Sequence, residues 1–176
     1  QLLVDLGATK LADRIGYRTC VVTSQVVSGV GLISMAFLPE VLSDPFAGIL
    51  LSVVLYAIGS GLIEVLVSPI VEACPFENKD SVMSLLHSFY CWGAVGVILL
   101  STVFFSIFGI EKWPVLACLW AIIPFVNIFN FLTCPIEHLT EDGQGIGIRK
   151  LFQVPMFWVA IVLMICAGAS ELAMAQ

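Results

Sequence analysis

Long apolar runs, each able to cross a lipid bilayer, constrain this chain more than any other feature. A membrane-spanning helix needs about 20 mostly apolar residues. Five runs meet this requirement, and they cover residues 19–38, 46–72, 82–108, 113–135 and 155–176. The tail of a further helix is predicted over residues 1–9. Only 11% of the residues are charged and 60% are hydrophobic, whereas soluble domains carry about 25% charged residues. This surplus of hydrophobic residues predicts that much of the chain is buried in lipid.

The predicted fold class is all-α, a polytopic membrane helix bundle. The runs are too long and too uniformly apolar for the alternating strands of a membrane barrel. Small residues recur along them and let neighbouring helix backbones approach closely in lipid. These residues are Ser24, Ser28, Gly29, Gly31, Gly59, Ser60, Gly61, Gly93 and Gly96. We therefore expect a packed bundle rather than separate anchors.

The basic residues predict how the helices are oriented in the membrane. Loops that alternate along the chain share one side, and cytoplasmic loops are rich in Lys and Arg. One set of loops contains Lys10, Arg14, Arg18, Lys79, Arg149 and Lys150, and the other contains only Lys112. The loops at 10–18, 74–81 and 136–153 are thus predicted to be cytoplasmic. We expect a multi-pass protein of the cell membrane, either a plasma or an inner membrane.

Both ends of the chain lie within apolar patterns, so we expect an interior piece of a longer protein. The remaining helices of that protein would be its partners in the bundle, together with the lipid bilayer. The longest connection, residues 136–153, contains Glu-Asp-Gly-Gln-Gly and ends in Ile148-Arg149-Lys150. A long charged connection of this kind is typical of a boundary between two sets of helices.

The turn from Lys10 to Arg18 contains the strongest local motif. It reads Lys-Leu-Ala-Asp-Arg-Ile-Gly-Tyr-Arg and resembles the loop signature of the major facilitator superfamily, G-x-x-x-D-R-x-G-R-R/K. The matching residues are Asp13, Arg14, Gly16 and Arg18, while Thr9 stands where the signature begins with Gly. The resemblance implies that this loop steadies one conformation of an alternating-access cycle. Gly16 would permit the sharp turn.

Two further segments resemble the fucose-permease-like (sugar) branch of that superfamily. Residues 59–69 are similar to its fourth helix, G-x-G-x-x-E-x-x-x-N-P, with Ser68 in place of Asn, and residues 85–94 are similar to its fifth. The resemblance implies a fragment from the end of helix 2 to helix 7. Residues 1–135 would belong to the N-terminal six-helix half. Residues 136–154 would form the cytoplasmic linker between domains, and residues 155–176 the truncated first helix of the C-terminal half.

Two carboxylates inside apolar runs, Glu64 and Glu171, are candidates for a solute or proton site. A charge at the centre of a membrane helix costs about 2.5–3.5 kcal/mol on insertion scales, so it is kept away from lipid. Glu64 shares a helix face with Ser60 and Ser68, and this polar stripe could line a water-filled cavity. The resemblance implies that Glu64 takes part in proton coupling and sugar binding. The alternative for Glu64 is a structural carboxylate hydrogen-bonded to a neighbouring helix. Glu171 could face the central cavity from the other side if its helix opens the second half.

Other polar side chains within the runs are weaker candidates for the same site. His87 could bond a sugar hydroxyl or relay a proton. Trp120, Asn127 and Asn130 fall on one helix face, where an indole and two amides suit a pyranose. The same residues also suit helix packing, with amides and a histidine joining neighbouring helices. Gln25 is interpreted as packing.

The function predicted from these features is secondary active transport of a small polar solute, most simply proton-coupled sugar symport by alternating access. A drug or metabolite efflux antiporter of the same superfamily and a non-transporting structural membrane protein remain alternatives. No H-E-x-x-H or G-x-S-x-G motif suggests an enzyme. No basic patch suggests nucleic-acid binding. The six cysteines form no C-x-x-C pair, so no metal or other cofactor is expected.

Overall fold

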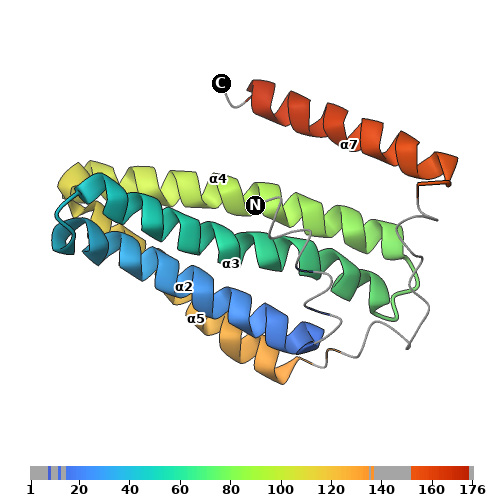
Figure 1. Cartoon of the computed structure of the whole chain (residues 1–176), viewed down its shortest axis with the longest axis horizontal. Coiled ribbons are helices and arrows are strands. Elements are labelled where there is room, and N and C mark those ends of the chain that lie inside the picture. Colours follow the sequence, from blue (N-terminus) through green and yellow to red (C-terminus); the bar gives the residue numbers. More distant parts are fainter. Residues whose placement is uncertain (1–7, 9–11, 13–14, 135, 137–151, 175–176) are drawn as a thin grey trace. The chain divides into compact units, whose positions relative to one another are not determined.

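The computed structural model describes residues 8, 12, 15–16, 17–134, 136 and 152–174 (Figure 1). They fall into two compact units, residues 1–139 and 140–176, which are described separately. Every regular element in the described ranges is a helix, which confirms the predicted all-α class. The expected helix tail over residues 1–9 and the linker over 136–154 lie almost wholly outside the described residues.

Among its described residues, the first unit contains four long helices and one short 3₁₀ turn. The helices are α2 (Tyr17–Val41), α3 (Pro45–Ala73), α4 (Lys79–Phe108) and α5 (Trp113–Thr133), with η1 (Ile110–Lys112) before the last. Each long helix is long and apolar enough to cross a membrane. The predicted runs are therefore confirmed, with ends that differ by three residues or fewer.

The second unit contains α7 (Pro155–Met174). In its first turn, the Trp158 indole nitrogen donates a hydrogen bond at 3.1 Å to the carbonyl of Phe152, which precedes the helix. The rings of Phe152 and Phe157 pack edge to face, 5.4 Å apart. These contacts fix the start of the helix that the sequence predicts from residue 155.

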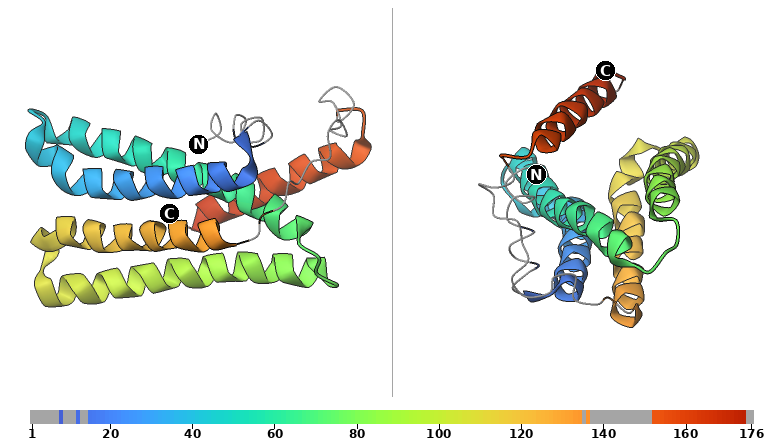
Figure 2. Two further views of the ribbon diagram at one scale, coloured as in Figure 1. Left: turned by 90° about the horizontal axis from the view of Figure 1, so that it is seen from below. Right: turned by 90° about the vertical axis from the view of Figure 1, so that its right-hand side faces the viewer.

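Local chemistry explains where the helices begin and end. Asp44 caps α3 by accepting a hydrogen bond from the Phe46 amide at 3.0 Å, and Pro45 occupies the first helical position, where its missing N–H is no loss. Gly109, at φ +81°, ends α4 in a conformation that favours glycine. Successive long helices run in opposite directions, and the 42–44 and 109–112 connections lie at the same end of the first unit (Figure 2).

The seam between α2 and α3 is the most tightly packed part of the first unit. A Cβ added at Gly31 would lie 2.5 Å from the Tyr56 amide nitrogen, and one at Gly59 would lie 2.5 Å from that of Ser28. Real Cβ atoms do not come so close to backbone. The two glycines therefore let the helix backbones touch, as the small residues predict. Nearby, Val21 and Leu66 are almost fully buried.

Helix α4 lies beside the other long helices of the first unit rather than among them, and it contains no buried residue. A Cβ added at Gly93 or Gly96 would meet no atom of the described residues within 4 Å. The prediction of close packing is wrong for these two glycines, because no described helix backbone faces them. One side-chain hydrogen bond joins α4 to α5, from the Trp120 indole nitrogen to Ser101 Oγ at 3.3 Å.

Candidate functional site

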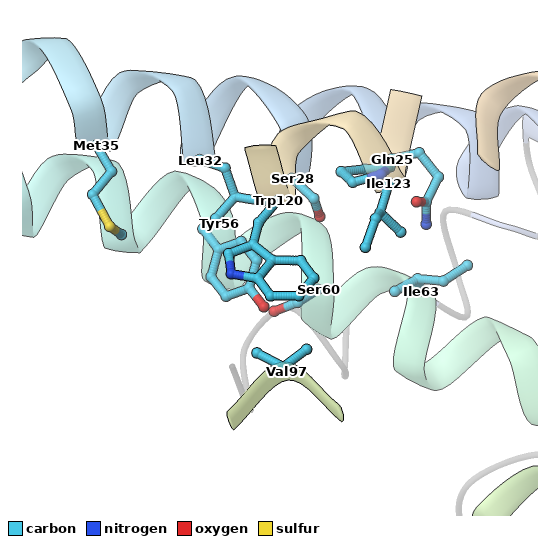
Figure 3. A pocket seen from close by; sticks show the side chains of 11 residues that line it. Gln25, Ser28, Leu32, Met35, Tyr56, Ser60, Ile63, Val97, Trp120 and Ile123 are labelled. Carbon is cyan, nitrogen blue, oxygen red and sulfur yellow. The ribbon is translucent and has the colours of Figure 1, made fainter. Parts of the chain in front are cut away.

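A cavity of about 430 Å³ lies within the first unit and receives side chains from all four long helices. Figure 3 shows its lining at close range. Its polar side chains are Gln25 and Ser28 from α2, Tyr56 and Ser60 from α3, and Trp120 from α5. Apolar side chains form the rest of the wall, among them Leu32, Ile63 and Val97. No lining residue is charged, so the cavity suits an uncharged molecule.

Ser28 is the exceptional polar group of this cavity. It is 5% exposed, and its hydroxyl has no hydrogen-bond partner among the described residues. A buried polar group without a partner costs about 1–3 kcal/mol. Ser60, by contrast, donates to the Ala57 carbonyl of its own helix at 3.3 Å, a common solution for serine in a helix. The Ser28 hydroxyl instead lies in the α2–α3 seam, where a Cβ added at Gly59 would collide with it.

Among the predicted solute-binding residues whose side chains the structure describes, Trp120 alone lines this cavity. Its half-buried ring is held in place through the hydrogen bond of its nitrogen to Ser101. Asn127 and Asn130 lie further along α5, where the Asn130 amide donates to Asn127 Oδ1 at 3.3 Å. The sequence predicts one common face for the three residues. In the structure Trp120 lines the cavity, whereas Asn127 and Asn130 form an amide pair outside it.

Glu64 and His87 lie outside the cavity lining. Glu64 is one turn beyond Ser60 on α3, and its side chain is exposed at the surface of the first unit. His87 is exposed on α4. Glu171 belongs to α7, but its side chain lies outside the described residues. Glu64 and His87 are thus exposed on the first unit and do not line its cavity.

The predicted switch loop is described only in part. Asp13 and Arg14 lie outside the described residues. Gly16 precedes α2 with φ +93°, which agrees with the predicted need for glycine at the turn. Arg18 donates to the Cys134 carbonyl at 2.8 Å, where α5 ends. A guanidinium at a helix C-terminus is favourable because it faces unpaired carbonyls and the negative end of the helix dipole.

Sequence reasoning missed Ser28 and Tyr56 as cavity residues and took Gln25 for packing. Small and amide side chains in apolar runs signalled packing, and Gln25 and Ser28 are indeed buried. Whether they also line a cavity depends on which helix faces meet, and a single sequence does not show this. Within the described ranges, no group of three His, Cys, Asp or Glu residues could hold a metal ion.

The family model described as Major Facilitator Superfamily matches residues 2–175 of this chain. The chain belongs to the major facilitator superfamily. No match was found among curated proteins or among solved structures. The family is one of membrane transporters, and the four long apolar helices agree with an integral membrane protein. Membership also accounts for the signature-like turn that ends in Gly16 and Arg18.

Proposed function

We propose that this major facilitator chain is part of a proton-coupled symporter for a small polar solute, and that the solute is a neutral sugar. The proposal rests on one observation above all. Glu64 stands within a 29-residue apolar helix, yet its side chain is exposed at the surface of the four-helix unit. A carboxylate at such a depth is costly against lipid, so a protein surface or a water-filled path must cover it.

A carboxylate in that place can take up and release a proton as its surroundings change. The polar side chains of α4 support the same interpretation. His87, Ser84 and Ser88 are all exposed on the first unit, and Ser88 donates to the Ser84 carbonyl at 2.9 Å. In transporters built from repeated halves, solute and coupling-ion sites lie near the bilayer midplane between the halves. Glu64 and His87 would face that region, and the role predicted for Glu171 is in the same solute and proton path.

The fucose-permease-like motifs support the sugar assignment and the division of the chain. In this proposal residues 1–135 belong to the first half, residues 136–154 to the linker, and residues 155–176 to the second half. Asp13, Arg14, Gly16 and Arg18 would form the loop that steadies one conformation. The Arg18 hydrogen bond to the end of α5 supports this role, because it joins the loop to a helix far along the chain.

The test measures uptake of labelled sugars by the whole protein in proteoliposomes under an imposed pH gradient. Glu64→Gln removes the titratable group but keeps the side-chain shape, and we expect at least about a tenfold loss of gradient-driven uptake, as for loss of a proton-transfer group. Glu72→Gln is the matched control, since Glu72 is an exposed acid near the end of the same helix. Equal uptake by wild type and Glu64→Gln would contradict the proposal.

The mainly apolar lining of the cavity favours one alternative, an efflux antiporter for amphipathic drugs or metabolites. Here the same proteoliposomes would expel a labelled amphipathic compound when protons flow inward. Absence of sugar uptake together with such efflux would replace the first proposal by the second. Transport of neither class would favour the non-transporting structural protein.

A further inference from the structure

The same short sequence pattern, Cys-Pro-apolar-Glu, stands at the ends of α3 and α5. It covers residues 74–77 and residues 134–137. Cys74 is the C-cap residue of α3, with φ −65° and ψ 145°, and Cys134 is that of α5, with φ −68° and ψ 131°. Such extended angles suit a residue that precedes proline, and proline cannot continue the helix. The two helices therefore end in the same way.

A helix that ends at a Cys-Pro step presents carbonyl oxygens that its own backbone does not satisfy. The last carbonyls of any helix lack donors further along the helix, and the proline that follows has no N–H to offer. These carbonyls are also the negative end of the helix dipole, which a Lys or Arg side chain in the last turn can balance. Neither α3 nor α5 has a basic residue in its last turn. Each end is therefore suited to a cation from another part of the chain.

Basic residues from the first turns of two other helices supply these cations. Lys79, the first residue of α4, donates from its ammonium group to the Glu72 carbonyl at 2.7 Å. Arg18, in the first turn of α2, donates from its guanidinium to the Cys134 carbonyl at 2.8 Å. Both contacts lie at the end of the first unit where α2 and α4 begin and α3 and α5 end (Figure 2). The repeated helix end thus has a repeated solution.

The positions of Arg18 and Lys79 are unfavourable for their own helices. The N-terminus of a helix is the positive end of its dipole, so a cation in the first turn is repelled there. No acidic residue in the first turn of α2 offsets this repulsion. Each cation faces the negative end of a different helix instead, where the same dipole effect is favourable. Residues that the positive-inside rule assigns to the cytoplasmic end therefore also have a structural use at that end.

We propose that Arg18 and Lys79 act as two clamps, each of them a basic side chain of one helix that holds the Cys-Pro end of another. The Lys79 clamp joins consecutive helices across seven residues, whereas the Arg18 clamp joins residues 116 apart in the chain. The Arg18 clamp therefore fixes the point where the chain leaves α5. Both cations and both carbonyl-bearing residues are exposed, so water competes for each contact and either clamp can open while the seam stays packed. The clamps depend on the fold alone, whatever solute the protein transports.

Amide hydrogen exchange in the whole protein, held in lipid nanodiscs, tests the two clamps separately. The exchange rate is measured in the last turn of α5, residues 130–134, and in the last turn of α3, residues 70–74. Arg18→Gln removes the cation, and we expect exchange about threefold faster in α5, as for loss of one exposed charged contact, with α3 unchanged. Lys79→Gln should give the reverse result, faster exchange in α3 and none of the change in α5.

Two further variants separate a clamp from a general effect of charge. Lys112→Gln is the matched control, because Lys112 is an exposed cation that precedes α5 at the other end of the first unit, and it should change neither rate. Arg18→Lys keeps the charge and should restore most of the wild-type rate in α5, since a lysine can also bond terminal carbonyls. Unchanged exchange in α5 of Arg18→Gln would overturn the proposal. Equal acceleration of both helix ends by Arg18→Gln would also overturn it, because that result indicates a general loss of stability.

Discussion

The α2–α3 seam and helix α4 have similar apolar sequences with similar glycines, but they pack in different ways. At the seam, Gly31 and Gly59 face the backbone of the opposite helix at distances that exclude any side chain. On α4, Gly93 and Gly96 meet nothing within 4 Å among the described residues. A small residue therefore permits close packing without specifying it. The facing surface decides whether a glycine is structural.

The largest expected effect comes from a methyl group added at the seam. In Gly31→Ala the new Cβ would lie 2.5 Å from the Tyr56 amide nitrogen, and backbone cannot turn aside as a side chain can. We expect a loss of about 1–3 kcal/mol of stability, measured by thermal unfolding in detergent. Gly93→Ala is the control and should be neutral or stabilising by up to about 1 kcal/mol. Equal melting temperatures for the two variants would refute the distinction between the regions.

An intermediate effect is expected where the glycine faces a side chain. A Cβ added at Gly29 would lie 3.0 Å from the Phe125 ring, which can shift. Gly29→Ala should therefore cost about 1 kcal/mol. Phe125→Leu makes room for the methyl group, so the double variant should lose less stability than the sum of the single variants. Strict additivity in thermal unfolding would show that the ring and the glycine are not in contact.

The smallest expected effect concerns the attachment of α4. Ser101→Ala removes the acceptor for the Trp120 indole, and a long, half-buried hydrogen bond of this kind is worth about 0.5 kcal/mol. Hydrogen exchange should become faster in α4 and stay unchanged in α2. Ser88→Ala is the control for loss of a serine hydroxyl from α4, because the hydrogen bond that it removes lies within α4 itself and joins no second helix. Faster exchange in both helices would mean that α4 belongs to the same cooperative unit as the seam.

The long helices could be predicted from the sequence because their length and apolar character are set by the membrane. The turn at Gly16 could also be predicted, since its positive φ favours glycine. The cavity could not, because Gln25, Ser28, Tyr56 and Trp120 meet only through the packing of three helices. The sequence also did not separate Gly31 from Gly93, which both lie in long apolar runs but have different neighbours in the fold. The predicted roles of Glu64, His87 and Glu171 stay predictions.

We propose that Glu64 couples solute entry to proton movement, and proton movement can be measured directly. Sugar is added to proteoliposomes that contain the whole protein, and external pH is recorded with no imposed gradient. Wild type and Glu72→Gln should take up protons with the sugar and make the medium more alkaline. Glu64→Gln should give no pH change while still exchanging labelled for unlabelled sugar. Sugar-dependent proton uptake of wild-type size in Glu64→Gln would contradict the account.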